Sequence, residues 1–340
     1  MKYHPIMYQL RKPYLVFLGD VSLRSDAKTG FGLRDWCPGD VLGECALPSA
    51  SVSLDLPRMT PAKAAGLGAG SIVIGVAPPG GRLPESWIPT LAEALSAGLD
   101  VVSGMHTRLE RYPQLVEAAG ERQVRLINVR HADRDWPVGT GLRRSGRRVL
   151  TVGTDCALGK KYTALAITRA LTARGVKATF RATGQTGILI AGQGVAIDAV
   201  VSDFIAGVAE TLSPANDADH WDVVEGQGAL FHPAYAGVTL GLLHGSQPDA
   251  IVLCHDPSRQ TIEDHPHVPL PALDEAIRRY LEAGRLTNPD IRCVGIAINS
   301  STLSDVEWLR YRDDLQAGLQ LPVCDPMRGG VEPIAQALVA

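Results

Sequence analysis

The sequence predicts an α/β fold with parallel sheets, divided between two domains. Short apolar runs rich in Val, Ile and Leu alternate with amphipathic stretches along most of the 340 residues, which is the pattern of β-α-β units. Many of the runs are apolar throughout, as expected of strands that helices cover on both faces. A chain of this length also exceeds the size at which a single hydrophobic core stops growing.

The N-terminal part of the chain is expected to form a Rossmann-like domain over residues 1–145. Strands are expected at 15–18, 71–76, 100–103 and 125–129, and helices at 60–66, 85–97 and 112–119. The segment KTGFGL at 28–33 is expected to offer Lys28 and a flexible glycine hinge. A G-x-G-x-x-G motif with its downstream acid is missing, so a dinucleotide site is disfavoured.

A second domain is expected over residues 146–340. The stretch 130–148 is polar, rich in Arg and Gly and without a hydrophobic period, so it is expected to link the two domains. Strands are then expected at 149–152, 176–182, 222–225, 249–254, 292–298 and 322–324, and helices at 160–173, 199–212, 271–283 and 304–319.

Composition and charge exclude several classes of function. The net charge is −3, with 45% apolar and 20% charged residues, which is typical of a globular protein and gives no basic surface for nucleic acid. Six cysteines without a C-x-x-C pair argue against a zinc site and for a reducing compartment. No apolar run approaches about 20 residues, and no targeting segment is visible. We therefore expect a cytoplasmic protein that acts on small molecules without contacting nucleic acid or membranes. Separately, we expect it to be a homo-oligomer.

A phosphate-binding loop is predicted in the segment VGTDCALGKKY at 152–162. A strand, a glycine turn and a helix follow one another there, and the N-terminus of such a helix attracts anions through its free N–H groups and its dipole. Lys160 adds a point charge for phosphate. The residues expected to contact the ligand are Gly153, Thr154, Cys156, Ala157, Leu158, Gly159, Lys160, Lys161 and Tyr162.

This loop departs twice from the Walker pattern G-x-x-x-x-G-K-[ST]. Gly153 stands one residue early, and Lys161 occupies the position of the hydroxyl that binds Mg²⁺. Thr163 shares the helix face but lies a turn deeper. A loop that keeps its phosphate contacts and lacks its metal ligand suits a ligand whose phosphates are not broken, such as coenzyme A.

Polar residues at the expected strand ends supply further candidates, because the carboxyl ends of parallel strands line the ligand crevice. Glu225 ends a strand at the Walker-B position, and His232 follows in a loop of small residues. The segment TGQTG at 183–187 follows another strand, and a loop is expected to carry His244 and Ser246. The predicted substrate-binding residues are Thr183, Gln185, Thr186, Gln227, His244 and Arg82. Each of these segments also has a structural interpretation, as a turn or as a satisfied side chain.

Four longer motifs together resemble the DgcN family, a P-loop-fold group whose characterised members are D-glutamate N-acetyltransferases. The motifs are GVAPPGGRLP at 75–84, VGTDCALGK at 152–160, RATGQTGILI at 181–190 and DVVEGQGALFHPAYAGVTLGLLHGSQPDA at 222–250. The similarity runs from about Asp26 to the C-terminus. It implies an N-terminal Rossmann-like domain and a C-terminal P-loop NTPase-like parallel-sheet domain. It also implies acetyl transfer from acetyl-CoA to the amine of D-glutamate, for which no metal is expected.

Such a reaction needs a base for the substrate ammonium, donors for the tetrahedral oxyanion and cations for the substrate carboxylates. We expect His232 as the base and Glu225 as its orienting partner, or the reverse. Asp155 is a reserve candidate for binding the ammonium.

Two other functions stay open at this point. An ATP-dependent carboxylate-amine ligase or small-molecule kinase of the dethiobiotin-synthetase type would place Lys160 on phosphate, with Asp155 or Glu225 on Mg²⁺. A nucleotide-binding regulatory protein without chemistry is weaker, because it leaves many polar loops without a role.

Overall fold

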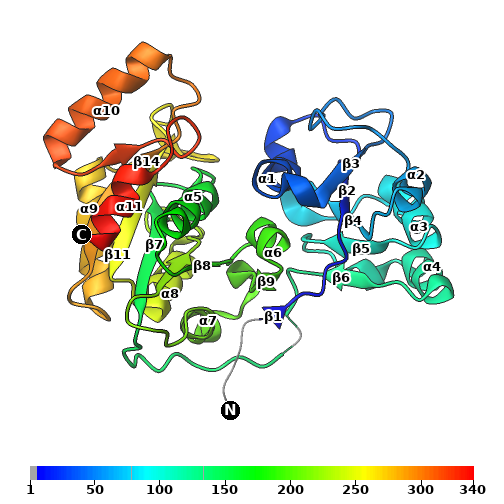
Figure 1. Ribbon diagram of the computed structural model, residues 1–340, viewed down its shortest axis with the longest axis horizontal. Helices are drawn as coiled ribbons and strands as arrows, with labels where there is room; N and C mark the ends of the chain where they lie inside the picture. The colour runs from blue at the N-terminus through cyan, green and yellow to red at the C-terminus, as the bar shows by residue number, and fades with distance from the viewer. Residues whose placement is uncertain (1–5, 78, 133) are drawn as a thin grey trace. The chain divides into compact units, whose positions relative to one another are not determined.

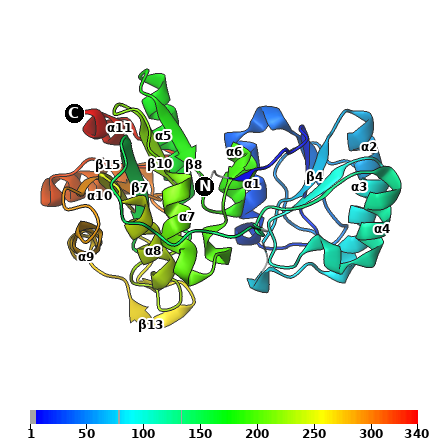
Figure 2. The same ribbon diagram turned by 90° about the horizontal axis from the view of Figure 1, so that it is seen from below.

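The computed structural model describes residues 6–77, 79–132 and 134–340, and these residues form two compact units (Figures 1 and 2). Of the described residues, the N-terminal unit contains 6–132 and 184–199, and the C-terminal unit contains 134–183 and 200–340. The sequence suggested a single division near residue 145; in the structure the chain returns to the N-terminal unit for residues 184–199. The described residues include no helix that is both long and apolar enough to cross a membrane.

The N-terminal unit is built on a parallel sheet in the order β3-β2-β4-β5-β6. Its strands are β2 (Tyr14–Phe17), β3 (Val41–Cys45), β4 (Ser71–Ile74), β5 (Asp100–Ser103) and β6 (Leu126–Asn128). Its helices are α1 (Lys28–Trp36), α2 (Pro61–Gly66), α3 (Ile88–Ser96), α4 (Pro113–Arg122) and α6 (Gln185–Ala191). A two-residue antiparallel pair joins β1 (Ile6–Met7) to β9 (Gln193–Gly194). Short 3₁₀ turns precede α3 (Glu85–Trp87) and α4 (Leu109–Arg111).

The C-terminal unit contains a parallel sheet in the order β15-β14-β11-β7-β10-β8. Its strands are β7 (Arg147–Gly153), β8 (Ala178–Arg181), β10 (Trp221–Val224), β11 (Ala250–His255), β14 (Arg292–Ile298) and β15 (Val323–Cys324). Its helices are α5 (Lys160–Ala173), α7 (Ile205–Leu212), α8 (Ala236–Ser246), α9 (Leu273–Arg285), α10 (Asp305–Leu319) and α11 (Glu332–Val339). A hairpin of β12 (Thr261–Ile262) and β13 (His265–Pro269) lies between β11 and α9.

The core of the C-terminal unit fixes the strand that carries the predicted phosphate loop. Leu150 and Val152 of β7 are buried against Leu242 of α8 and Tyr280 of α9, whereas α5 and α11 contact each other and cover the opposite face (Figure 2). The buried Tyr280 hydroxyl donates to the Gly153 carbonyl at 2.8 Å. A side chain of α9 therefore fixes Gly153, the last residue of β7.

The predicted α/β class and both parallel sheets are confirmed, and three local expectations are wrong. The segment at 28–33 is the start of helix α1 rather than a hinge, with the Gly30 N–H bonded to the Gly75 carbonyl at 2.7 Å. No helix was expected between residues 173 and 199, whereas Gln185 begins helix α6. The loop expected around His244 is the last turn of α8, because its glycines allow close helix contact: a Cβ at Gly245 would lie 2.2 Å from the Ala206 carbonyl oxygen.

Candidate functional site

The predicted phosphate loop joins β7 to α5 at the carboxyl edge of the C-terminal sheet. Strands β8 and β10 lie on one side of β7, and β11, β14 and β15 lie on the other, so the loop follows a point where the strand order reverses, which is where open α/β sheets bind ligands. Gly159, immediately before α5, has a φ of +102°, and Ala157 has a φ of +53°. The side chain of Leu158, which belongs to the loop, is buried.

Lys160 is the first residue of α5, and its side chain is almost fully buried inside the loop. Its Nζ donates to the Asp155 carbonyl at 2.7 Å, and burial lowers the pKa of the amine. Glycines make room for the chain: a Cβ at Gly226 would lie 3.1 Å from Lys160 Cδ and 1.7 Å from the Thr151 carbonyl oxygen. A buried ammonium of this kind gains from an anionic ligand, since the anion compensates its lost hydration.

Asp155 fastens the loop to the segment 256–270, which contains the hairpin. Its side chain is fully buried, and one carboxylate oxygen accepts the Cys156 N–H at 2.6 Å. The other oxygen accepts Arg259 Nη1 and the Glu263 N–H, both at 2.8 Å. Because the carboxylate is fully buried and paired with Arg259, its contacts do not support the expectation that Asp155 binds the substrate ammonium.

Arg259 is the functional candidate that sequence reasoning missed. Besides its ion pair with Asp155, its Nη1 donates to the Cys156 carbonyl at 3.0 Å, so the guanidinium lies against the phosphate loop. Its side chain keeps 20% of its surface exposed, so a ligand can reach it. The available signal was an arginine four residues after β11, the strand beside β7.

His232 has a defined tautomer in this structure. Its Nδ1 accepts the Ala234 N–H at 3.1 Å, so the neutral ring carries its proton on Nε2. Burial lowers the pKa of the imidazole, which keeps the ring neutral. The ring lies 4.9 Å from that of His265 and 4.4 Å from that of Tyr235, centroid to centroid. His232 is therefore suited to donating a hydrogen bond from Nε2 rather than to accepting a proton there.

Glu225 directly follows β10, the strand beside β7, as predicted for a Walker-B position. It is buried, and its Oε2 accepts the Thr183 N–H at 2.9 Å. The Thr183 hydroxyl in turn donates to the Glu225 carbonyl at 2.7 Å. The next residue, Gly226, donates its N–H to the Thr151 hydroxyl at 2.9 Å. These bonds fix the carboxylate at the carboxyl edge of the sheet.

Asp155, Cys156 and His232 each offer one possible metal-ligand atom, and these atoms lie within 4.8 Å of one another. The donor set fits a metal poorly. The Asp155 carboxylate already accepts Arg259, and the lone pair of the neutral His232 ring points at the Ala234 N–H. Burial also raises the pKa of the Cys156 thiol, whereas a metal binds the thiolate.

Other residues of the loop have identifiable partners. The Thr154 hydroxyl lies 2.9 Å from Nδ1 of His255, the last residue of β11. Burial lowers the pKa of His255 to about 4, so this ring is neutral. Lys161 places its ammonium 5.1 Å from the centre of the Tyr162 ring, where it is not a ligand for Mg²⁺ but remains a cation beside the loop.

Two predicted substrate-binding residues lie on the connection after β10. Gln227 is in the turn, where its carbonyl accepts the Thr239 hydroxyl at 2.7 Å. The prediction that His244 lies in a loop beside the site is wrong: α8 runs from the carboxyl edge back to the amino edge of the sheet, so its last turn, which contains His244, lies away from the phosphate loop. There, His244 Nε2 is 3.0 Å from the Ala283 carbonyl, which gives His244 a structural contact with α9.

The remaining predicted residues belong to the N-terminal unit. Gln185 Oε1 accepts Arg130 Nη2 at 3.0 Å, and the Thr186 hydroxyl lies 2.8 Å from that of Thr29. These bonds attach α6 to its own unit, so they give both side chains a structural role. Arg82 is exposed and lines a cavity of the same unit.

Two family models match the chain, one in the N-terminal part and one in the C-terminal part. A model described as a domain of unknown function (DUF1611_C), P-loop domain, matches residues 137–335. A second, described as a domain of unknown function (DUF1611_N), Rossmann-like domain, matches residues 42–132. Together they support the two domain types that the sequence predicted.

Similar proteins extend over almost the whole chain. A protein of Tritonibacter scottomollicae named D-glutamate N-acetyltransferase is 44% identical over 97% of this chain and 99% of its own length. One of Pseudoalteromonas sp. with the same name is 42% identical over the same shares. A crystal structure of a DUF1611 family protein from Anabaena variabilis has a TM-score of 0.87 and 32% identity, covering 96% of this chain and 99% of that one.

Proposed function

The chain belongs to the DUF1611 family, and on that premise we propose that it transfers an acetyl group from acetyl-CoA to the amine of D-glutamate. The observation that carries the proposal is the pair of relatives named D-glutamate N-acetyltransferase, 44% and 42% identical over 97% of this chain. The products are N-acetyl-D-glutamate and CoA. The six cysteines are free thiols, which agrees with action in the reducing cytoplasm.

The phosphate loop is proposed to bind the phosphates of CoA. Lys160 and Arg259 supply two cations beside the N-terminus of α5, and each already bonds to loop groups that a phosphate can replace or join. Lys161 at the position of the Mg²⁺-binding hydroxyl supports a ligand that keeps its phosphates intact.

Glu225 is proposed as the base and His232 as a hydrogen-bond donor to the oxyanion. The amine nitrogen attacks the thioester carbonyl, a C–N bond forms, and the C–S bond breaks. One proton of the ammonium passes to Glu225 before the attack, and the nitrogen loses a second proton as the amide forms, which the leaving thiolate takes up to give CoA. The Nε2–H of neutral His232 supports this assignment, because it can donate to the oxyanion but cannot accept a proton.

Full activity is expected in the presence of EDTA. A thioester is already activated, so acyl transfer needs neither ATP nor a metal. The measurement is CoA release from acetyl-CoA with D-glutamate, with L-glutamate as the comparison acceptor. Turnover that EDTA abolishes and Mg²⁺ restores, together with ATP cleavage in the same preparation, would instead support the ligase or kinase.

Replacing Arg259 by alanine is expected to raise the KM for acetyl-CoA by about tenfold, the effect of one lost charge-assisted bond. With S-acetyl-N-acetylcysteamine, a thioester without phosphates, the same substitution should leave kcat/KM unchanged. Asp155→Asn should give a smaller change of the same kind, because it loosens Arg259 without removing the guanidinium.

Arg279→Ala is the matched control, since this exposed arginine of α9 forms a surface ion pair with Glu275 on its own helix. An equal loss with both donors in Arg259→Ala would mean that Arg259 supports the fold rather than the phosphates.

A further inference from the structure

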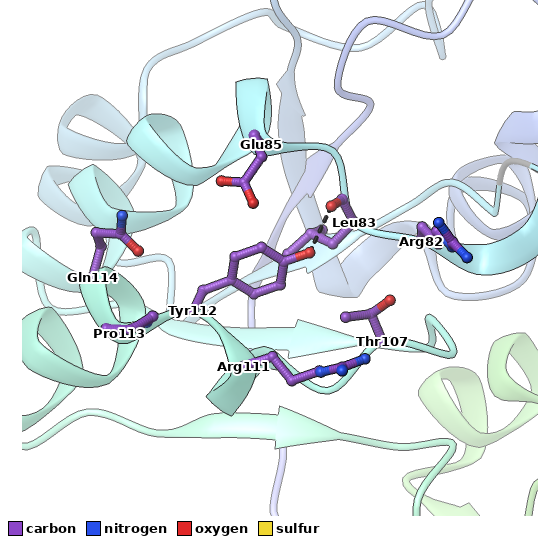
Figure 3. A pocket seen from close by; sticks show the side chains of 8 residues that line it. All are labelled: Arg82, Leu83, Glu85, Thr107, Arg111, Tyr112, Pro113 and Gln114. Atoms are coloured by element: carbon purple, nitrogen blue, oxygen red, sulfur yellow. Dashed lines mark hydrogen bonds between the residues drawn. The ribbon is translucent and has the colours of Figure 1, made fainter.

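A cavity of about 580 Å³ lies in the N-terminal unit (Figure 3). Two connections form it, from β4 to α3 and from β5 to α4, and both leave the carboxyl edge of the parallel sheet. Ligands of α/β folds bind at this edge. The lining residues are Arg82, Leu83, Glu85, Thr107, Arg111, Tyr112, Pro113 and Gln114.

Three charged side chains line this cavity: Arg82, Arg111 and Glu85. Within the described ranges, none of the three makes a hydrogen bond or an ion pair with another protein group. A nearby carboxylate behaves differently, since both oxygens of Glu110 accept Asn128 Nδ2, at 2.9 and 2.8 Å. Two cations and one anion are thus available to a ligand on one concave surface.

The side chains are arranged around a fixed aromatic ring. The Tyr112 hydroxyl donates to the Leu83 carbonyl at 2.7 Å, so the ring is a wall of the cavity and its proton is engaged. Figure 3 shows Arg111 and Thr107 on one side of the ring, the Glu85 carboxylate on the other side, and Arg82 beyond the hydroxyl end of the ring. Burial and then Glu85 raise the pKa of Tyr112, which agrees with a carboxylate close to its hydroxyl.

We propose that this cavity binds a small α-amino dicarboxylate. Arg82 and Arg111 receive its two carboxylates, and Glu85 receives its ammonium, so the charges of the site and of the ligand are opposite and equal. Guanidinium groups suit this role because their planar donors match a carboxylate in pairs. The inference rests on the proposed function in taking D-glutamate, the acceptor, as the ligand; Glu85 pairs with the ammonium of the bound amino acid before the amine is deprotonated for transfer.

The test is calorimetric titration of the full chain, without acetyl-CoA, using D-glutamate and glutarate. Glutarate has both carboxylates and no ammonium. Arg111→Ala and Arg82→Ala should each lower the affinity for both ligands by about tenfold, as expected for the loss of one charged hydrogen bond. Glu85→Gln should lower the affinity for D-glutamate, because it removes the partner of the ammonium. It should raise the affinity for glutarate, because it removes a charge that repels carboxylates.

Arg122→Ala is the matched control, because this exposed arginine lies at the far end of α4, outside the cavity. It should leave both affinities unchanged. Kinetics give the second readout: the cavity variants should raise the KM for D-glutamate and leave the KM for acetyl-CoA at the wild-type value. Circular dichroism checks that each variant folds, and Arg111→Gln or Arg82→Gln replaces the alanine variant of the same arginine if that variant does not fold.

Two results separate this inference from the proposed function. If the protein transfers acetyl groups and its KM for D-glutamate is unchanged by all three substitutions, the cavity is not the binding site, and the proposed function still stands. If dicarboxylates bind in a way that depends on the three side chains but the protein releases no CoA, the proposed function is refuted, and binding at the cavity still stands. Unchanged affinity for both ligands in the Arg82→Ala/Arg111→Ala double variant would also refute the inference.

Discussion

Glu225→Gln is expected to lower kcat for acetyl transfer by about 100-fold or more, the contribution of a positioned general base. Glutamine keeps the size of the side chain and can still accept the Thr183 N–H through its amide oxygen, as the carboxylate does at 2.9 Å. It cannot take the proton of the substrate ammonium. The loss should therefore appear in kcat, with the KM for acetyl-CoA little changed.

His232 is expected to behave as a donor in the same experiment. His232→Gln retains an N–H group and should keep more activity than His232→Ala. In the wild type, protonation of His232 should begin below its ordinary value of 6.5, because burial lowers its pKa. Any acid limb from this ring therefore lies below pH 6.5 and should disappear in His232→Gln.

The measurement is a pH–rate profile of kcat from pH 5 to 9 for the three variants and the wild type. If Glu225→Gln keeps the wild-type kcat across this range, the carboxylate is structural and the base is another group. Equal activity of His232→Gln and His232→Ala would remove the donor role of His232.

The phosphate loop was predictable from sequence because its determinants are local. A buried strand, glycines and a lysine at a helix start fall within VGTDCALGK, and α5 begins and ends at the predicted residues. The position of Glu225 followed from the same strand rule. Both predictions depend on backbone geometry that adjacent residues impose.

Contacts between distant residues account for what the sequence did not reveal. Arg259 acts on a loop more than 100 positions away in the chain, through the bond to Asp155, and no local pattern marks that partner. His244 was misplaced because HGS resembles a loop, whereas its glycine permits α8 to approach α7. The tautomer of His232 depends on the Ala234 N–H, a contact that appears only once the loop is folded.

Lys160→Ala is expected to weaken CoA binding by about 1.5–3 kcal/mol, or roughly 10- to 150-fold, the value of a charge-assisted hydrogen bond. The ammonium is buried and bonded to the Asp155 carbonyl at 2.7 Å, so a phosphate that enters the loop meets a cation with little competing water. Lys160→Met keeps most of the stem beside Gly226 and removes only the charge, so it should lose a similar affinity with less effect on stability.

Calorimetric titration with CoA measures this loss, and Lys177→Ala supplies the matched control. Lys177 carries the same charge but is exposed, and it pairs with Asp217 and Asp219 on the surface. In the wild type, burial lowers the pKa of Lys160 below its ordinary 10.5. CoA affinity should therefore fall as alkaline pH deprotonates the amine, and this fall should be absent in Lys160→Met. CoA affinity equal to that of the wild type in both Lys160 variants would show that the loop does not bind the phosphates of CoA.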